Sequence, residues 1–561
     1  MRRAFAAFAG VCLAVALALN ASAQVNPPVP APSGPVNPAF AAPEPAATSP
    51  APDASPDEQS PPPEVTPTPT PVPTPTPPPI EVSPAAPALE PGRVVTARVN
   101  SAAGDIVATV ADPAVAAVSV DQLARTISIT GLTVGVTVIT VADARGITRD
   151  VPVRVAYVAG TVADRIALHL TGDPASAGFL REAAIRAAGA AATLRPGARA
   201  TAVPESVTTR NDLGIDDHAA VDVPLQLSGD AYLNGGGTTH VELFNDALPR
   251  LAPSRLLVSD YPERLTADGV LFSATIDRTR PQRFLYYHYN PGTEPARRIL
   301  VKATNASLLP AVVHLIAGLA GPGANEMEVG HIATKSFLVR LRRNEGTIVT
   351  IPPNATVNLV NHDLPPNAVV NGILQLHEIS GDPLTIAVVA QHADAPLDQS
   401  PDTATLLSGG APHARGVYPV PEFFSDYTYS VEAPALEIPL GQLPLPNLRQ
   451  GDALAGDYGV EQSMRVVIVN SGRSAQPVAL YANPRGGDAT GTFIIDNTLV
   501  QAHRLGAFTR YKLWQETIAP GTYRTLQITT MPEGGSSYPL RLIFAPDDGS
   551  VAPGAPGSPV Y

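Results

Sequence analysis

The feature that most constrains this chain is a proline-rich stretch near its N-terminus. Between Val25 and Gly92, 25 of 68 residues are proline. Proline fixes φ and removes a backbone donor, so such a stretch favours extended polyproline II over helix or sheet. Its most regular part is the run TPTPTPVPTPTPPP from Thr66 to Pro79. We therefore expect residues 24–92 to form a disordered, semi-rigid spacer, with the folded domains after it.

The residues before the spacer have the three parts of a secretory signal peptide. Arg2 and Arg3 precede an apolar run from Ala4 to Leu19, which is followed by the small residues Ala21-Ser22-Ala23. The sequence predicts an exported protein that is periplasmic, on the cell surface or secreted, and it leaves both Sec and twin-arginine export open. The only cysteine, Cys12, lies inside the apolar run, so the cleaved chain has no thiol for a disulfide or a metal.

Composition favours β-structure. The chain has 561 residues, too many for one core, and 44% of them are hydrophobic, so cores can form. Glycine and proline together contribute 106 residues, and aromatic residues only 5%, which is typical of many turns and short strands. We expect a mainly β protein of tandem antiparallel β-sandwich (Ig-like) domains with one short Ala-rich helix.

The charge of the chain argues against a nucleic-acid partner. The formal net charge is −13, and it becomes −15 when the signal with its two arginines is removed. No stretch after residue 24 approaches the roughly 18 consecutive apolar residues of a membrane span, so we expect no span in the mature chain. An envelope or surface protein or a polysaccharide is the expected partner.

The residues from Arg93 to Tyr157 contain short β-branched runs separated by turn signals, among them VVTARV, IVATV, TISIT and VTVITV. The segments DPAVAAVSVD, ISITGLTVGVTVITVADARG and VPVRVAY resemble bacterial Ig-like domains of the second group. They are also similar to the N-terminal β-domain of pilus-assembly secretins. The resemblance covers about 65 residues and implies an extracytoplasmic structural or adhesive module that carries no active residues.

The periodicity changes after this region. A strand IALHL from Ile166 is followed by Asp173-Pro174, which we expect to cap and begin a helix that runs to about Ala192. The alanines of this helix would pack on a neighbouring sheet. The segment is expected to be a small α/β or bridging unit.

The remaining residues contain an internal repeat. In each copy an asparagine ends a strand, a proline opens the next strand, and a threonine and a leucine begin two later strands. The turn asparagines are expected to close Asx hydrogen bonds. The repeated order of strands and turns predicts an antiparallel sandwich made twice. The matched landmarks are Asn305, Pro310, Thr347 and Leu374 in the first copy, and Asn470, Pro477, Thr517 and Leu526 in the second.

These observations predict seven segments. They are a signal peptide (1–23), the Pro-rich spacer (24–92), an Ig-like β-sandwich (93–157), the α/β or bridging segment (158–215), β-sandwich repeat 1 (216–395), β-sandwich repeat 2 (396–545) and a disordered tail (546–561).

Motifs with known chemistry are missing from the sequence. We find no nucleophile elbow, HExxH, phosphate loop, dinucleotide turn or EF-hand loop, so we expect no catalytic residue, no metal and no cofactor. The Gly-rich piece GLAGPGANE has no lysine and no expected helix after it, and we interpret it as a turn. Acidic loop groups at Asp382, Asp488 and Asp547-Asp548 could hold calcium, or could be solvated aspartates.

The most suggestive surface is the run FLYYHYN from Phe284 to Asn290. Strand alternation would put Tyr287 and Tyr289 on one face and Tyr286 and His288 on the other. Such faces can stack on sugars, or they can pack against a core and its rim. The same two interpretations apply to the run PEFFSDYTY from Pro421 to Tyr429.

Three functions are compatible with the sequence. The first is an exported non-enzymatic protein that acts in envelope or surface structure, adhesion or assembly. An alternative is a carbohydrate- or polymer-binding protein that uses Tyr286, Tyr287, His288 and Tyr289. A further alternative is a hydrolase or other enzyme, whose site would require His288, His331 and His377 to converge in one cleft.

Overall fold

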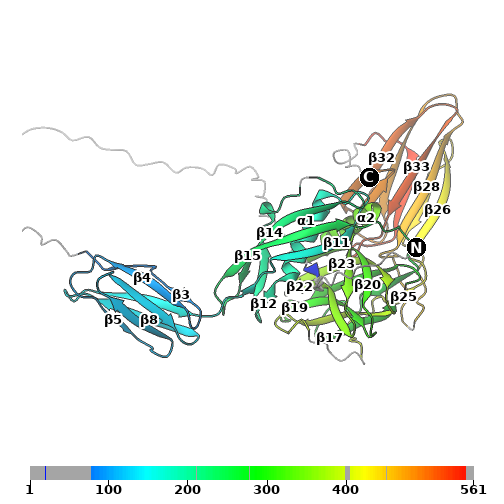
Figure 1. Ribbon diagram of the computed structural model, residues 1–561. Coiled ribbons are helices and arrows are strands. Elements are labelled where there is room, and N and C mark those ends of the chain that lie inside the picture. The colour runs from blue at the N-terminus through cyan, green and yellow to red at the C-terminus, as the bar shows by residue number, and fades with distance from the viewer. Residues whose placement is uncertain are drawn as a thin grey trace, which may run out of the picture. The chain divides into compact units, whose positions relative to one another are not determined.

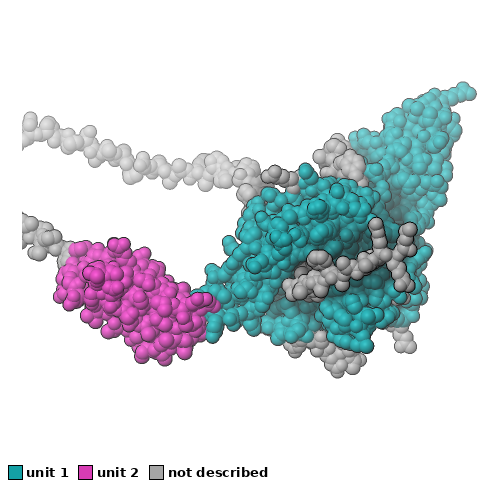
Figure 2. All heavy atoms as spheres, in the orientation of Figure 1, with its two compact units in different colours: residues 1–23, 156–561 teal, residues 24–155 magenta. Residues whose placement is uncertain are grey.

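Strands dominate the structure, a computed structural model that describes the backbone of residues 19–20 and residues 78–209, 211–276, 278–398, 405–449 and 451–550 (Figure 1). The predicted fold class, mainly β with tandem antiparallel sandwiches, is confirmed. Most of the predicted signal peptide and spacer, and the end of the predicted tail, lie outside the described residues. The chain forms two compact units, residues 24–155 and residues 1–23 with 156–561 (Figure 2).

The smaller unit is a sandwich of two four-stranded sheets. Its strands alternate between buried and exposed residues, so one face of each sheet supplies the core, which includes Ile127, Ile129, Ile139 and Val141. One sheet has the order β2 (Glu81–Ser83), β4 (Val94–Asn100), β7 (Thr126–Gly131) and β6 (Ala116–Asp121). The other has the order β3 (Ala88–Leu89), β9 (Thr148–Val155), β8 (Gly135–Ala142) and β5 (Val107–Val110).

This N-terminal sandwich begins earlier than Arg93, where the sequence placed its start. Ile80, Val82 and Leu89 are buried in its core, and β2 and β3 each pair with a later strand. A short apolar segment between prolines can form an edge strand, because the missing N–H of proline is tolerated at the edge of a sheet. The last part of the predicted spacer therefore belongs to the fold.

The larger unit contains two further sandwiches. Sandwich 1 spans residues 160–418 and is built on a ten-stranded sheet, which is faced by a smaller sheet. The large sheet has the order β13 (Arg199–Ala202), β14 (His218–Ser228), β15 (Gly235–Asn245), β11 (Arg165–Thr171), β21 (Gly346–Ile351), β20 (Ala311–Gly323), β23 (Ala368–Ser380), β18 (Gln282–Asn290), β16 (Arg255–Ser259) and β25 (Arg415–Tyr418). The smaller sheet has the order β1 (Leu19–Asn20), β22 (Ala355–Leu364), β19 (Arg297–Asn305), β24 (Leu384–His392) and β17 (Gly269–Ile276). Short elements beside them are β10 (Gly160–Thr161), which pairs with β12 (Thr193–Leu194), and the 3₁₀ turn Pro204–Ser206.

The Ala-rich helix α1 (Ala177–Ala191) covers part of the large sheet. It begins after Ser176, whose side chain accepts the N–H of Phe179, and not at Asp173-Pro174 as the sequence predicted. The strand before it, β11, lies between β15 and β21. The segment 158–215 is thus part of sandwich 1, because β11 pairs on both sides with strands of that sheet.

A second helix, α2 (Glu326–Arg343), was not predicted. The Gly-rich piece GLAGPG lies in strand β20, and α2 begins immediately after the capping residue Asn325, so the interpretation of that piece as a turn without a following helix is wrong. Gly318 of β20 explains the close packing, because a Cβ there would lie 2.3 Å from the backbone oxygen of Ala333 in α2. The helix ends at Asn344, which adopts a left-handed conformation (φ 55°).

Sandwich 2 spans residues 422–546. Its two sheets enclose a core that includes Val466, Leu480, Phe493 and Phe544. One sheet has the order β26 (Glu422–Ser430), β28 (Glu461–Asn470), β33 (Thr522–Thr530), β30 (Ala489–Ile495) and β31 (Thr498–Leu505). The other has the order β27 (Leu436–Leu440), β34 (Leu540–Pro546), β29 (Gln476–Pro484) and β32 (Tyr511–Ile518).

The turn asparagines of the predicted repeat are equivalent in the structure. The side-chain N–H groups of Asn305 and Asn470 each donate to the carbonyl four residues further on, at 2.8 and 2.9 Å. Each Oδ1 accepts the backbone N–H two residues on. The prediction that both close Asx turns is confirmed.

The predicted match of Leu374 with Leu526 is wrong. Leu526 lies on β33, which pairs with β28 as β22 pairs with β19. Leu374 lies on β23, which pairs with β20 as β34 pairs with β29. Neighbouring strands of a sandwich share the same alternation, so a pattern alone does not distinguish them.

The predicted tail is held to sandwich 2 at its start. Lys512, whose side chain is almost fully buried, pairs with Asp547 and donates to the backbone oxygen of Ser550. Residues 546–550 are therefore fastened to β32 by a buried cation, and the proposed disorder of residues 551–561 lies outside the described part.

Candidate functional site

The tyrosine-rich run from Phe284 to Asn290 lies on β18 in the interior of sandwich 1. Tyr286 and His288 are completely buried: the Tyr286 hydroxyl is 2.9 Å from Nδ1 of His362, and His288 contacts the side chain of Ser259 at 3.1 Å. Burial raises the pKa of Tyr286 well above its usual range and lowers that of His288 to about 4.

The other face of the same strand is also covered. Tyr287 is only 7% exposed, and the half-buried Tyr289 ring has the guanidinium of Arg264 over it at 4.9 Å from the ring centre. The four residues are therefore brought together as packing groups, without a free aromatic face for a sugar. Alternation predicted their two faces, but it could not show that both faces are packed.

The three histidines required for an enzyme site are not in one cleft. His288 of β18 lies opposite Val370 of β23, and His377 is seven residues further along β23. At about 3.3 Å per residue this separates them by roughly 23 Å. His331 lies on α2, where its Nδ1 is 3.0 Å from a carboxylate oxygen of the buried Glu533.

Two of the acidic residues considered for calcium are paired with cations. Asp488 pairs with Arg504 at 2.8 Å, and Asp547 pairs with Lys512, while Asp382 is exposed. Among the residues that the structure describes, no group of three or more His, Cys, Asp or Glu side chains lies close enough to hold a metal ion. Within the same described part, no helix is both long and apolar enough to cross a membrane.

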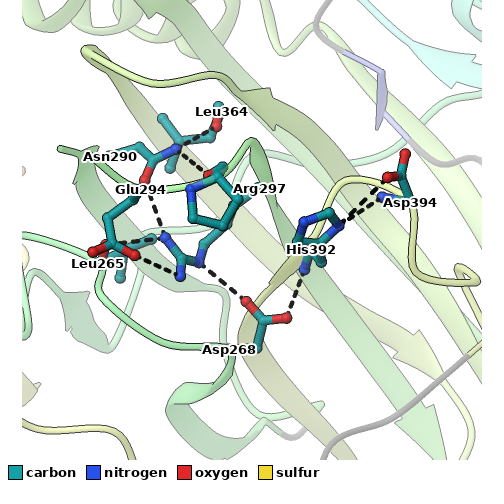
Figure 3. A network of polar contacts seen from close by, with 9 residues as sticks. Leu265, Asp268, Asn290, Glu294, Arg297, Leu364, His392 and Asp394 are labelled. Atoms are coloured by element: carbon teal, nitrogen blue, oxygen red, sulfur yellow. Dashed lines mark hydrogen bonds and ion pairs between the residues drawn. The ribbon is translucent and has the colours of Figure 1, made fainter. Parts of the chain in front are cut away.

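A polar network in sandwich 1 is built around the guanidinium of Arg297 (Figure 3). The buried guanidinium of Arg297 pairs with Asp268 and Glu294, each at 3.0 Å, and donates to Oδ1 of Asn290 at 3.2 Å. Asp268 also accepts the backbone N–H of His392 at 2.8 Å. Because its charges are paired within the fold, this network joins strand ends and offers little to a ligand.

A cavity of about 340 Å³ lies where sandwich 1 meets sandwich 2. This volume falls in the range of roughly 300–1,000 Å³ that small ligands occupy. Sandwich 1 contributes the loop after β15 and the C-terminal part of α2, and sandwich 2 contributes residues of β26, β28, β30 and β33. The lining residues are Arg250, Leu251, Ala252, Leu338, Leu341, Arg342, Asn344, Gln375, Glu422, Phe424, Glu461, Ser463, Ile494 and Thr529. We call this cavity the inter-sandwich pocket.

Arg283, which is completely buried, fixes the two acidic residues of the pocket. Its guanidinium, on β18 of sandwich 1, pairs with Glu422 and Glu461 of sandwich 2, each at 3.2 Å. It also donates to the backbone oxygen of Pro421 at 2.8 Å, and it lies 5.4 Å from the ring centre of Phe337. One cation thus sets the position of two carboxylates from another sandwich.

The two carboxylates influence each other. Glu422 and Glu461 are register partners on the parallel pair β26 and β28, so their side chains are neighbours. Burial and the charge of Glu461 raise the pKa of Glu422, while Arg283 acts in the opposite direction. Each retains oxygen lone pairs that can accept hydrogen bonds from a ligand's hydroxyl groups.

Phe424 is the aromatic residue among those that line the pocket. It belongs to β26, an edge strand of its sheet, and 76% of its surface is exposed, whereas Tyr429 of the same strand is buried in the sandwich core. The run PEFFSDYTY therefore divides into a packed part and an exposed part. Sequence reasoning singled out this run but did not connect it with Arg250, Arg342 or Arg283, because these groups meet only through the contact between the sandwiches.

The contact beside the pocket is closely packed. A Cβ at Gly330 of α2 would lie 1.7 Å from the backbone oxygen of Gly534, in the loop before β34. Apolar residues from both sandwiches form one cluster here, among them Phe337, Tyr418, Ile494 and Met531. The pocket walls are therefore held in a fixed relation to each other.

Comparisons with known proteins give no family for this chain. No family model matches the sequence, and no curated protein matches it. Among solved structures, the human desmocollin-1 ectodomain aligns at 10% identity with a TM-score of 0.12, covering 37% of this chain and 48% of that one. The chain thus spans about half the length of that structure.

Two bacterial structures show similar low values. SGBP-B of the Bacteroides ovatus mixed-linkage glucan utilization locus, in complex with a mixed-linkage heptasaccharide, aligns at 11% identity with a TM-score of 0.11, covering 53% of this chain and 70% of that one. The Clostridium perfringens ZmpB M60 catalytic domain with two CBM51 domains aligns at 8% identity with a TM-score of 0.13, covering 83% and 55%. Similarity at this level carries no argument about function.

Proposed function

We propose that this protein is an exported, non-enzymatic binding protein of the cell envelope or surface, and that its inter-sandwich pocket holds a segment of a carbohydrate polymer. The observation that carries the proposal is the exposed Phe424 ring beside two carboxylates that a buried arginine fixes. Sugars are commonly bound by an aromatic ring that covers their C–H face together with polar groups that bond their hydroxyls. The predicted signal peptide agrees with export.

The N-terminal sandwich has a separate part in this proposal. Its resemblance to bacterial Ig-like domains favours a structural or adhesive module, which would display the larger unit from the proline-rich spacer. No chemistry is assigned to it. Binding is placed in the larger unit, where the described pocket lies.

Glycan-array binding of the mature chain tests this function. We expect binding to a subset of polysaccharides and its loss in Phe424→Ala, because the stacking surface is removed without changing the core. Tyr523→Ala is the matched control, since Tyr523 is an equally exposed aromatic residue of sandwich 2 that does not line the pocket. Binding that survives Phe424→Ala as well as it survives Tyr523→Ala would contradict the proposal.

The non-enzymatic part has its own test. Two neighbouring carboxylates, one with a raised pKa, are the kind of pair that glycoside hydrolysis uses, although in hydrolases they stand on opposite sides of the bond. Here they lie side by side and share Arg283. We expect no release of reducing ends from any polysaccharide that binds, and release that Glu422→Gln abolishes would identify an enzyme.

A further inference from the structure

Two arginines of the inter-sandwich pocket, Arg250 and Arg342, have no carboxylate partner among the residues that the structure describes. Of the three arginines in the last turn of α2, Arg340 pairs with Glu182, and Arg343 lies near Asp212 and Glu345. Arg342 lines the pocket, and its hydrogen bond in the described part goes to the neutral amide oxygen of Asn497 at 2.8 Å. Arg342 is exposed, and its charge is therefore free to meet an anion from solution.

Arg250 faces the same cavity from the loop after β15. The structure gives it no hydrogen bond or ion pair among the described residues, although the charge of Asp173 acts on it from a distance. Partial burial and the charge of Arg342 lower the pKa of Arg250. Both residues are exposed, so an anion that enters the cavity can reach the two guanidinium groups without breaking an existing ion pair.

The charges of the pocket are divided between its walls. Sandwich 1 presents Arg250 and Arg342, while sandwich 2 presents Phe424 with Glu422 and Glu461. The glutamates are held by Arg283 on the buried side, so they do not neutralise the two pocket arginines by direct contact. A ligand that fits both walls must offer an anionic group to one side and hydroxyl donors with an apolar face to the other.

We infer that Arg250 and Arg342 form a carboxylate subsite, so that the polymer bound in the inter-sandwich pocket is an acidic polysaccharide built of uronic acids. The inference rests on the proposed function and names its ligand class. A uronic acid ring carries one carboxylate for the guanidinium groups, hydroxyls for Glu422 and Glu461, and a C–H face for Phe424. An acidic peptide fits less well, because its side chains lack hydroxyl donors for the two glutamates and its further carboxylates would meet them.

The test compares a galacturonic acid tetramer with its methyl ester by titration calorimetry on the mature chain. The two ligands differ in the carboxylate and share the ring and hydroxyls. We expect the acid to bind at least tenfold more tightly, and Arg250→Ala and Arg342→Ala each to weaken its binding by about 10- to 100-fold while leaving the ester unchanged. Added salt should weaken binding of the acid.

Arg465→Ala is the control. Arg465 is an exposed arginine on β28, the strand that carries Glu461, but it pairs with Asp426 and does not line the pocket. Equal binding of acid and ester, insensitive to both pocket arginines but lost in Phe424→Ala, would overturn the inference and leave the proposed function standing. Binding of neither ligand, or binding of polyglutamate as tight as that of the tetramer, would also overturn it. The glycan array decides the proposed function separately.

Discussion

At the residue scale, Asp457 is a buried carboxyl without a counter-ion. It is 5% exposed, its Oδ1 has no hydrogen-bond partner in the described structure, and its backbone has a left-handed φ of 54°. Burial raises its pKa from 3.8 to about 6, although the backbone N–H of Gly441 acts against this. The folded state therefore holds this proton more tightly than the unfolded chain does.

The raised pKa of Asp457 makes the stability of the fold depend on pH. The contribution of a raised carboxyl pKa is fully present below about pH 4 and is lost as pH rises through about 6. We expect Asp457→Asn, which stays neutral and tolerates the left-handed backbone, to melt at least about 2 °C above the unmodified chain at pH 7 and close to it at pH 4. Thermal unfolding at both pH values checks this, with the exposed Asp452→Asn as control. Equal melting temperatures at pH 7 would contradict it.

Single residues also show what sequence reasoning could reach. The hydrogen bonds of Asn305 and Asn470 were predictable, because an Asx turn is local and depends on residues within four positions. The surroundings of Tyr286 and Tyr287 were not, since the groups that cover them come from strands and loops far along the chain. A turn hydrogen bond can be predicted from neighbouring residues, whereas the burial of a side chain depends on residues distant in the sequence.

At the element scale, Gly318 lets β20 pack closely against α2. A Cβ at Gly318 would meet the backbone of Ala333 and Phe337 at 2.3 and 2.4 Å. We expect Gly318→Ala to destabilise the larger unit by about 1–3 kcal/mol, because backbone atoms of α2 must move. Urea unfolding monitored by circular dichroism measures this.

Gly189→Ala in α1 is the opposite case and serves as its control. No atom beyond the nearby backbone of α1 lies within 4 Å of the position that its Cβ would take, so the substitution should stabilise the chain by about 0.5–1 kcal/mol. If the two substitutions change the urea midpoint in the same direction, the contact at Gly318 does not have the proposed importance.

Most strands were predictable because alternation marks them, but α2 was missed. Its buried residues Val329, Ala333 and Phe337 recur every four residues, and Asn325 stands at its start as a cap, so a signal was present. The acidic first turn and the basic last turn are further helix signals, but the glycines before the helix favoured the interpretation as a turn. The helix is stabilised by β20 and β23, which the sequence does not place beside it.

At the scale of the whole molecule, the N-terminal sandwich has a core of its own. Fifteen buried residues from seven of its eight strands and from the connections between them form one cluster, and residues 24–155 make a separate compact unit. We expect a fragment of residues 78–155 to fold alone and to unfold cooperatively in urea, and Ile129→Ala to lower its midpoint because it leaves a cavity in this core. A fragment that begins at Arg93 should be less stable, since it lacks Ile80, Val82 and Leu89. Equal midpoints for the two fragments would contradict the boundary.

The overall organisation was only partly predictable. The tandem β-sandwiches follow from composition and order, whereas export stays a prediction. The candidate pocket does not, because Arg250, Arg342 and Phe424 come from segments up to 174 positions apart and meet where two sandwiches touch. A contact between domains leaves little periodic trace in either segment.

The position of Arg283 also bears on the order in which the chain is made. Its guanidinium is synthesised 139 residues before Glu422 and 178 before Glu461. Until those residues are synthesised, Arg283 has no carboxylate from sandwich 2 to pair with. Gly330 of α2 likewise lacks its close contact with Gly534. Sandwich 1 therefore gains its two carboxylate partners for Arg283 only after sandwich 2 has been synthesised. Folding of the first sandwich is expected to be completed when the second sandwich docks on it.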